Sequence, residues 1–376
     1  MIETVFLFLS LFYGGLILFF YIGIRRERAR KPASNHWQPF VSVLVPARNE
    51  AAHIVSTLQS LAGQTYPASR LEIIVIDDHS SDCTGETVRG FIAAHGLAHF
   101  RLLSHRVDGV QPTYKKTAIA YALQSARGEI IMTTDADCRV QPDWVASMVS
   151  RYDAETGMVA GLAAFDPAYE KTLFHKLQTL EFAGLVFAGV GAVGNHYPLI
   201  CNGSNLSYRK TVYEEVGGFA GHDHIPSGDD DLFMQNVHHY TRWKIRYNLD
   251  FKAVNFTRPV DSLRAFLNQR ARWASKGTHY PGFKTLLILL LIYFYYVALL
   301  SLPVLTVAGR FSGAVLLAGF LLKLIPEFLI LSQALNVLQR RELLRWFAVA
   351  EIFHTPYIVL AGLRGFFKLY RWKRET

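Results

Sequence analysis

Long apolar runs lie at the two ends of the chain, and the region between them has a mixed polar and apolar pattern. The runs are Thr4–Ile24, Thr285–Gly309, Phe311–Leu335 and Trp346–Leu363. A helix needs about 20 predominantly apolar residues to cross a bilayer. The first two runs contain no charged residue, whereas Lys323 and Glu327 interrupt the third and Glu351 interrupts the fourth. We therefore expect one transmembrane helix at the N-terminal end and two or three at the C-terminal end.

The first run fits either a cleaved signal peptide or a retained anchor. Met1, Ile2 and Glu3 provide no basic leader, and no small-residue cleavage site follows the run. Basic residues come after it instead: Arg25, Arg26, Arg28, Arg30 and Lys31. Because cytoplasmic flanks are rich in Lys and Arg, we expect a retained anchor with the middle region in the cytoplasm. This predicts a multi-pass protein of the cell (inner) membrane.

The fourth run, Trp346–Leu363, is difficult to reconcile with this orientation as a complete membrane span. Two further spans return Arg340, Arg341 and Arg345 to the cytoplasm, as the charge rule requires. A complete fourth span then places the basic tail, with Lys368 and Arg371, on the opposite side. The run is therefore re-entrant or interfacial, or the rule fails here, and the sequence leaves both interpretations open.

The middle region alternates short apolar runs with amphipathic stretches. The predicted buried strands are Val41–Val45, Leu71–Ile76, Phe100–Leu103 and Glu129–Thr133. The predicted helices between them are Ala51–Leu61, Thr84–Ala94 and Tyr114–Ala126. Beyond them, Glu170–Val190 is a long apolar helical pattern that suits the membrane surface or a cover over an acceptor site. Alternation of this kind predicts an α/β fold with a mostly parallel sheet flanked by helices.

Polar clusters follow three of the predicted strands. They are Pro46–Glu50, Asp77-Asp78 and Asp135-Ala136-Asp137. The carboxyl ends of parallel strands form the ligand-binding edge of such a sheet, so these clusters are expected to converge. Asp135 and Asp137 project to the same side of an extended segment and suit Mg²⁺ or Mn²⁺. Each aspartate pair also has a simpler interpretation as turn and capping residues, and for Asp77-Asp78 that role is compatible with binding a nucleotide base or ribose.

Gly228 precedes three consecutive aspartates, Asp229, Asp230 and Asp231, at the predicted start of a helix. One carboxylate there is explained by helix capping and by the helix dipole. Three exceed what capping needs, and crowding raises a carboxylate's pKa, which suits a general base. We choose Asp230 as the candidate base.

An amphipathic helix is expected from Ser262 to Lys276, just before the second apolar run. It carries the segment Gln269-Arg270-Ala271-Arg272-Trp273. Trp and Arg are common at bilayer surfaces, so an interfacial helix is the simpler interpretation. The functional alternative stacks Trp273 under a sugar and directs Arg270 or Arg272 at phosphate.

Three further groups have two interpretations each. Lys115-Lys116 either reaches a pyrophosphate or is solvated. His222-Asp223-His224 either binds metal or forms a gate or surface feature. Lys323 and Glu327, four residues apart, either neutralise each other or lie beside a lipid headgroup or glycan path.

The net charge of +9 does not indicate nucleic-acid binding, because much of the excess flanks the apolar runs. Anionic lipid headgroups are the natural partner there. Three cysteines fall in the predicted cytoplasmic region: Cys83, Cys138 and Cys201. Their spacing matches no metal site, so we expect reduced thiols.

These motifs together resemble family 2 glycosyltransferases with a GT-A fold, over roughly Val41 to Gly277. The resemblance implies nucleotide-sugar contacts from Ala47, Arg48, Glu50, Asp77, Asp78, Lys116 and Asp135. It implies a metal held by Asp137 and Asp135, an acceptor and diphosphate site with Asn202, Gly203 and Asp229, and Asp230 as base. Gln269, Arg270, Arg272 and Trp273 fall in a segment similar to the Q-x-x-R-W pattern of cellulose, chitin and hyaluronan synthases and of ceramide glucosyltransferase. The expected organisation is an anchor (1–24), a basic linker (25–40), a cytoplasmic glycosyltransferase domain (41–284) and a C-terminal membrane region (285–376).

The function implied is a hexosyltransferase-type, inverting transfer. A sugar moves from a nucleotide-sugar, expected to be a UDP-sugar, to a polysaccharide or lipid acceptor with the help of Mg²⁺ or Mn²⁺. Asp229 departs mildly from the family's usual Glu. Three or four spans are few for an enzyme that secretes polymer through its own channel, which favours a lipid acceptor or a partner membrane or export protein. The alternatives are single-sugar transfer to a ceramide- or polyprenol-type lipid and a non-catalytic assembly scaffold.

Overall fold

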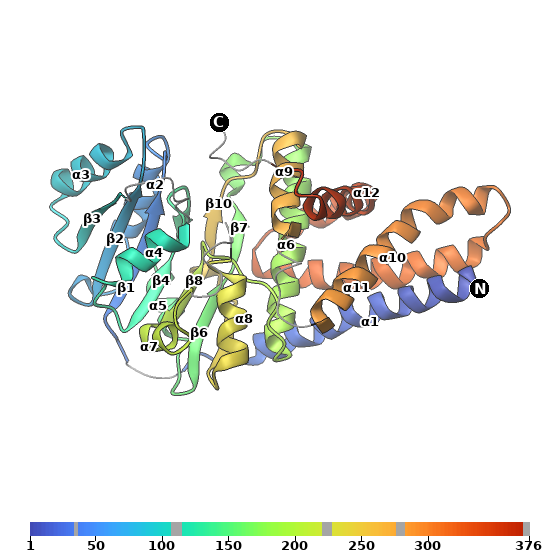
Figure 1. Cartoon of the computed structure of the whole chain (residues 1–376), viewed down its shortest axis with the longest axis horizontal. Helices are drawn as coiled ribbons and strands as arrows, with labels where there is room; N and C mark the ends of the chain where they lie inside the picture. The colour runs from blue at the N-terminus through green and yellow to red at the C-terminus, as the bar shows by residue number, and fades with distance from the viewer. Residues whose placement is uncertain (34–36, 107–114, 220–227, 276–282, 371–376) are drawn as a thin grey trace. The chain divides into compact units, whose positions relative to one another are not determined.

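The computed structural model describes residues 1–33, 37–106, 115–219, 228–275 and 283–370 (Figure 1). The chain divides into two compact units, each assembled from separate stretches of sequence. We call Arg25–Asp166 with Ala192–Arg258 the sheet unit. Met1–Ile24, Pro167–Gly191 and Pro259–Thr376 form the helical unit. Residues 167–191 therefore pack with the apolar helices although they lie inside the predicted 41–284 domain.

A seven-stranded sheet of order β3-β2-β1-β4-β8-β6-β9 organises the sheet unit. Its strands are β1 (Val41–Ala47), β2 (Leu71–Asp78), β3 (Phe100–His105), β4 (Ile130–Thr133), β6 (Thr156–Gly161), β8 (Leu206–Arg209) and β9 (Lys244–Asn248). β1, β2, β3 and β4 are mutually parallel, β8 is antiparallel to both its neighbours, and β9 is parallel to β6. The predicted mostly parallel sheet is confirmed. β5 (Arg139–Val140), β7 (Ala163–Phe165) and β10 (Asn255–Thr257) form a second, three-stranded sheet.

Helices flank the large sheet. They are α2 (Ile54–Ala62), α3 (Thr84–His95), α4 (Lys115–Leu123), α5 (Trp144–Val149), α7 (Lys210–Glu215) and α8 (Asp231–Tyr240). α2, α3 and α4 overlap the three predicted helices, with ends that differ by up to three residues. Short 3-10 turns occur at Ala68–Arg70 and Phe251–Ala253. Gly96, with φ 60°, ends α3 in the left-handed conformation that glycine adopts without strain.

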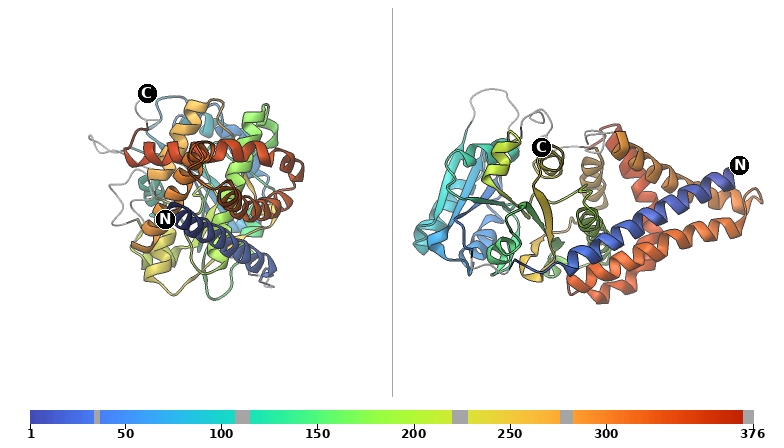
Figure 2. Two further views of the ribbon diagram at one scale, coloured as in Figure 1. Left: turned by 90° about the vertical axis from the view of Figure 1, so that its right-hand side faces the viewer. Right: turned by 90° about the horizontal axis from the view of Figure 1, so that it is seen from below.

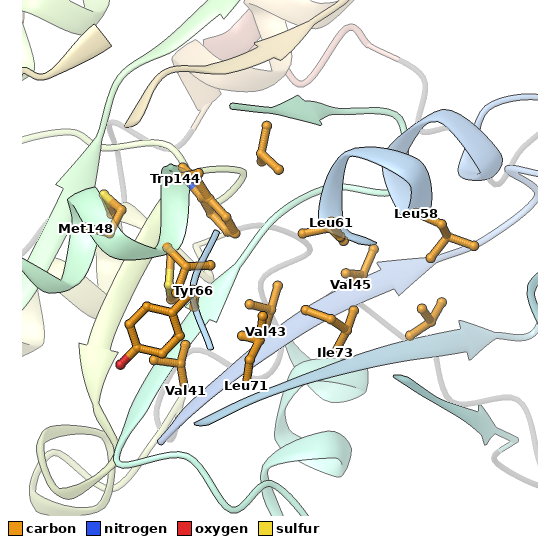
Figure 3. Packing of buried hydrophobic residues seen from close by; sticks show 14 of the residues in the cluster. Val41, Val43, Val45, Leu58, Leu61, Tyr66, Leu71, Ile73, Trp144 and Met148 are labelled. Atoms are coloured by element: carbon orange, nitrogen blue, oxygen red, sulfur yellow. The ribbon is translucent and has the colours of Figure 1, made fainter. Parts of the chain in front are cut away.

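The core explains why the strands are uninterrupted apolar runs. Val43 and Val45 of β1 and Ile73 of β2 have no exposed surface, and Leu58 and Leu61 of α2 are fully buried in the same cluster (Figure 3). Strands of a sheet covered on both faces require apolar residues on both faces. A buried polar pair interrupts these runs, because the fully buried Glu72 of β2 accepts hydrogen bonds from the Ser42 hydroxyl of β1 at 2.5 Å and from the Arg127 backbone N–H at 2.7 Å.

The helical unit contains most of α1 (Ile2–Ala29) and of α6 (Leu173–Gly194), together with α9 (Leu263–Ala274), α10 (Phe283–Val307), α11 (Gly313–Val337) and α12 (Phe347–Phe366). Figures 1 and 2 show α1 alongside α10 and α11. Among the described residues, five helical stretches are long and apolar enough to cross a membrane: α1, α6, α10, α11 and Arg341–Phe366, which joins a 3-10 turn to α12. Four correspond to the predicted runs. The fifth is α6, whose apolar surface is mostly covered by protein.

Lys323 of α11 pairs with Glu327 at 2.7 Å, as its spacing predicted. The structure adds partners from three other helices. Glu351 of α12 also pairs with Lys323, whose side chain is fully buried. Tyr13 of α1 and Tyr296 of α10 hydrogen-bond to Glu327 Oε1. Four apolar helices thus meet at one polar cluster, which satisfies the buried lysine.

Candidate active site

The carboxyl ends of β1 and β2 are adjacent, as expected for parallel neighbours. Ala47 lies opposite Asp77 in the β1–β2 register, and Asp78 lies opposite His105 in the β2–β3 register. The following loops are also joined, because Asn49 Oδ1 accepts a hydrogen bond from the Ser81 N–H at 2.8 Å and the Glu50 N–H donates to Thr84 Oγ1 at 2.9 Å. The predicted nucleotide residues Ala47, Arg48, Glu50, Asp77 and Asp78 therefore lie along one edge of the sheet.

Asp77 is held by hydrogen bonds on both carboxylate oxygens. The Ser80 N–H donates to Oδ1 at 3.2 Å and Arg106 Nη2 donates to Oδ2 at 2.7 Å. Burial alone would raise the pKa of Asp77, but the hydrogen bonds from Ser80 and Arg106 outweigh burial and lower the pKa below its ordinary value. Asp77 is therefore ionised at neutral pH.

Two histidines contact Asp78, and neither was identified from the sequence. His79 Nδ1 and His105 Nδ1 both lie 2.9 Å from Asp78 Oδ1. A carboxylate oxygen only accepts, so each imidazole donates through Nδ1. The sequence could have indicated His105 only through strand pairing, because His105 ends β3 and lies opposite Asp78 of β2.

Asp135 and Asp137 directly follow β4 and are both half-buried, whereas the intervening Ala136 and the following Cys138 are buried. The segment is a turn rather than the extended stretch that was predicted, because the Cys138 N–H donates to the Asp135 carbonyl oxygen at 3.2 Å. One ligand atom from each of Asp135, Asp137 and Cys138 lies within 4.8 Å of the others. Burial and the nearby charge of Asp137 raise the pKa of the Cys138 thiol well above its ordinary value, so the sulfur stays protonated. The two carboxylates are hard oxygen ligands of the kind that suits Mg²⁺ or Mn²⁺.

Lys115 joins this pair to the aspartates of α8. Its Nζ lies 2.6 Å from Asp135 Oδ1 and 3.2 Å from Asp229 Oδ2. Burial alone would lower the pKa of Lys115, but the charges of Asp135 and Asp229 outweigh burial and raise it, so the amine is cationic. The resemblance had indicated Lys116 instead, and Lys116 is only 2% exposed. The structure therefore adds Lys115 at these aspartates, and the predicted role of Lys116 stays a prediction.

Asp230 caps α8 and also contacts the loop that carries Asn202 and Gly203. Its Oδ1 accepts a hydrogen bond from the Asp231 N–H at 2.8 Å, and its Oδ2 accepts one from the Gly203 N–H at 3.2 Å. The Gly203 carbonyl in turn accepts from Thr133 Oγ1 at 2.8 Å. The end of β4, the loop with Gly203 and the start of α8 are therefore joined by hydrogen bonds. Asp231 is buried, which separates it from the half-buried Asp229 and Asp230.

Gln269, Arg270, Arg272 and Trp273 lie on α9, in the helical unit. The Ser262 hydroxyl caps this helix by accepting from the Ala265 N–H at 3.2 Å, so the expected amphipathic helix is confirmed. The Arg270 guanidinium is bound by Glu181 of α6. The predicted sugar and phosphate contacts of this segment remain predictions. His222, Asp223 and His224 lie outside the described residues.

Comparison with known proteins shows which family the chain belongs to. The model of glycosyl transferase family 21 matches residues 3–372, nearly the whole chain. The chain belongs to this family. The glycosyltransferase resemblance is thus confirmed, and the matching family model is family 21 rather than family 2.

Two curated relatives and one solved structure are similar to this member of family 21. A beta-monoglucosyldiacylglycerol synthase of Trichormus variabilis is 29% identical over 64% of this chain and 49% of its own length. A poly-beta-1,6-N-acetyl-D-glucosamine synthase of Staphylococcus epidermidis is 24% identical over 72% of this chain and 63% of its own length. The chain therefore spans between about half and two thirds of these relatives. The mannosyltransferase PcManGT of Pyrobaculum calidifontis, solved with GDP-Man and Mn²⁺, aligns over 97% of this chain and 99% of its own, with a TM-score of 0.60 and 20% identity, and supports the GT-A fold.

Proposed function

We propose that this protein is a membrane-bound, inverting glycosyltransferase that moves a sugar from a nucleotide-sugar to a lipid or polysaccharide acceptor. One observation carries the proposal: Lys115 contacts both Asp135 and Asp229, which brings the candidate metal site next to the candidate base Asp230. Membership of glycosyl transferase family 21 supports the reaction class.

The donor side of the reaction is assigned to the sheet edge. Ala47, Arg48, Glu50, Asp77 and Asp78 contact the nucleotide, for which a UDP-sugar is our first expectation. Asp137 and Asp135 hold Mg²⁺ or Mn²⁺, which when bound neutralises charge on the departing diphosphate. Lys115 adds a second positive charge beside them and joins Lys116 in our assignment. The Lys115 ammonium near the leaving group favours cleavage of the sugar–phosphate bond.

The acceptor side is assigned to Asn202, Gly203, Asp229 and Asp230. Asp230 removes the proton from an acceptor hydroxyl as the hydroxyl oxygen attacks the anomeric carbon. The bond between that carbon and the diphosphate oxygen breaks on the opposite face, so the configuration inverts. Asp230 suits this role because the Gly203 N–H and the start of α8 fix its carboxylate.

The apolar helices support an acceptor or product at the bilayer. We assign the protein to the cell membrane with the sheet unit in the cytoplasm, following the basic residues after α1. Single-sugar transfer to a lipid and polymer synthesis are both consistent with the similar proteins, one named for a glucosyldiacylglycerol product and one for a poly-N-acetylglucosamine product.

The test uses detergent-purified protein with UDP-glucose, UDP-N-acetylglucosamine and GDP-mannose. Acceptors are supplied in phosphatidylglycerol vesicles containing diacylglycerol, ceramide or a polyprenyl phosphate. Release of nucleoside diphosphate should require Mg²⁺ or Mn²⁺ and stop with a chelator. Mass analysis of the product separates the alternatives, since chains of many sugars exclude single transfer. A protein that binds none of these donors in the presence of metal would instead be a scaffold.

Asp230→Asn tests the base. Asparagine keeps the oxygen that caps α8 but cannot accept the proton, so transfer should fall by about a thousandfold with donor binding largely intact. Asp250→Asn is the matched control, because Asp250 also caps a helical turn, through the Lys252 N–H at 3.0 Å, and has no assigned catalytic role. Full transfer activity in Asp230→Asn would remove the base assignment.

A further inference from the structure

Arg270 makes an ion pair inside the helical unit that does not fit the phosphate contact expected for it. Its Nε lies 3.0 Å from both carboxylate oxygens of Glu181 on α6, and Nη2 also contacts Oε2. Nη1 donates to Gln269 Oε1 at 2.5 Å. Each guanidinium nitrogen therefore has an acceptor within the protein. The residue is only 4% exposed.

A third helix binds the same carboxylate. The hydroxyl of Tyr357 on α12 donates to Glu181 Oε1 at 2.6 Å. Arg270 of α9 and Tyr357 of α12 therefore both donate to the Glu181 carboxylate of α6, and the three helices meet at this carboxylate. Aromatic rings complete the site, because the Arg270 guanidinium lies 4.5 Å from the Phe266 ring centre and 4.3 Å from the Trp273 ring centre.

This geometry constrains the two neighbours of Arg270 for which a role in acceptor binding was expected. The Gln269 side chain is oriented by its hydrogen bond to Nη1. The Trp273 ring contacts both the guanidinium and Phe182 of α6, whose ring centre is 5.8 Å away. Planar guanidinium groups orient partners well because they combine a fixed fork of donors with a stacking face.

We propose that Arg270, Glu181 and Tyr357 form a positioning latch that fixes Gln269 and Trp273 for acceptor binding. In this role Arg270 acts through its neighbours and does not contact the donor diphosphate. The inference rests on the proposed function. Within the segment from Gln269 to Trp273, Arg272 remains the candidate phosphate contact.

The variants are Glu181→Gln, Tyr357→Phe and Arg270→Lys. Arg340→Gln provides a matched control, because Arg340 forms another bidentate pair in the same unit, with Glu170 at 2.9 and 2.6 Å. Steady-state transfer is measured with the donors and vesicles of the previous section. All three latch variants should raise the KM for the vesicle acceptor about tenfold and change the KM for the donor less than twofold. Arg340→Gln should lower only the thermal stability.

Two kinetic results would overturn the latch. A donor KM that rises in Arg270→Lys but not in Glu181→Gln or Tyr357→Phe would show that Arg270 contacts the donor directly. An acceptor KM that rises equally in Arg340→Gln would show a general loss of packing. The double variant Arg270→Met with Glu181→Leu checks for folding failure. Apolar replacement of a buried ion pair often preserves stability, so this variant should melt near the wild type yet keep the raised acceptor KM.

Absence of transfer by the wild-type protein would count against the proposed function and not against the latch. In that case the latch is tested by fluorescence. The emission of Trp273 is obtained by subtracting the spectrum of the Trp273→Phe variant from that of the parent protein. A shift of this component in Glu181→Gln and Tyr357→Phe, with none in Arg340→Gln, supports the latch. An unchanged component in all three rejects it.

Discussion

The space at Gly203 is set by three residues of the candidate active site. A Cβ there would lie 2.8 Å from Asp229 Oδ2, 3.1 Å from Lys115 Nζ and 3.3 Å from Asp230 Cβ. Gly203→Ala should therefore displace the charged groups and lower kcat by about tenfold, since small misplacements of reacting groups are costly. Gly90→Ala, on an open face of α3, is the control and should leave activity unchanged. Equal activity of both variants in the transfer assay would contradict this.

Asp77 predicts a pH dependence of stability. Its pKa is lowered in the folded protein because the hydrogen bonds from Ser80 and Arg106 outweigh burial. A lowered pKa contributes stability that is present above the unfolded pKa and is lost as the pH falls through the folded value. Asp77→Asn should therefore melt well below the wild type at pH 7, and the gap should narrow as the pH falls below about 4. Melting curves between pH 7 and pH 3 in detergent test this, and a gap that widens on acidification would contradict it.

Residue types and spacing were enough to predict the aspartates but not their partners. Asp135 and Asp137 were expected to lie together on an extended segment, whereas a turn closed by the Cys138 N–H and the Asp135 carbonyl brings their ligand atoms together. Lys115 and Lys116 are successive residues of a helix and point in different directions, and nothing local says which one faces the site. The contacts of His105 and Arg270 likewise depend on neighbours distant in sequence, Asp78 and Glu181.

At the level of elements, β1 to β4 and α2 to α4 were predictable because their apolar runs match the period of each structure, whereas β5 to β10 were not predicted. α6 was harder to interpret. Its apolar pattern suited either the membrane surface or a cover over an acceptor site. In the structure Glu181 pairs with Arg270 of α9, and most of the helix is buried, including Gly191 against the backbone of Phe20 on α1. Only tertiary contacts distinguish a buried helix from one that lies on a membrane.

Gly191 gives a prediction for the α1–α6 contact. A Cβ at this position would lie 2.3 Å from the Phe20 carbonyl oxygen, and a backbone atom cannot rotate away as a side chain can. Gly191→Ala should therefore separate the helices and lower stability by about 1–3 kcal/mol. Gly184→Ala on the same helix has no atom within 4 Å of its new Cβ and should be neutral or slightly stabilising. The melting temperatures of both variants are measured in the same detergent. Equal melting temperatures would contradict the close approach of Gly191 to Phe20.

The whole molecule combines a sheet unit, which carries the candidate donor site and base, with a helical unit that carries α9. Each unit draws on distant stretches of sequence. The position of an apolar run in the sequence therefore does not show which unit the run belongs to, as the segment 167–191 illustrates. The orientation of the molecule in the membrane was inferred from the charges that follow α1, and the three cysteines make that inference testable.

Cys83 is exposed in the sheet unit, whereas Cys138 and Cys201 are buried. A maleimide that cannot cross membranes should therefore label the folded protein at Cys83 alone. If the sheet unit is cytoplasmic, right-side-out vesicles should remain unlabelled until they are permeabilised, and inside-out vesicles should label at once. Cys83→Ser should abolish labelling in both, and a membrane-permeant maleimide should label either kind of sealed vesicle. Labelling of Cys83 in sealed right-side-out vesicles would reverse the orientation and place the candidate donor site outside, where cytoplasmic nucleotide-sugars cannot reach it.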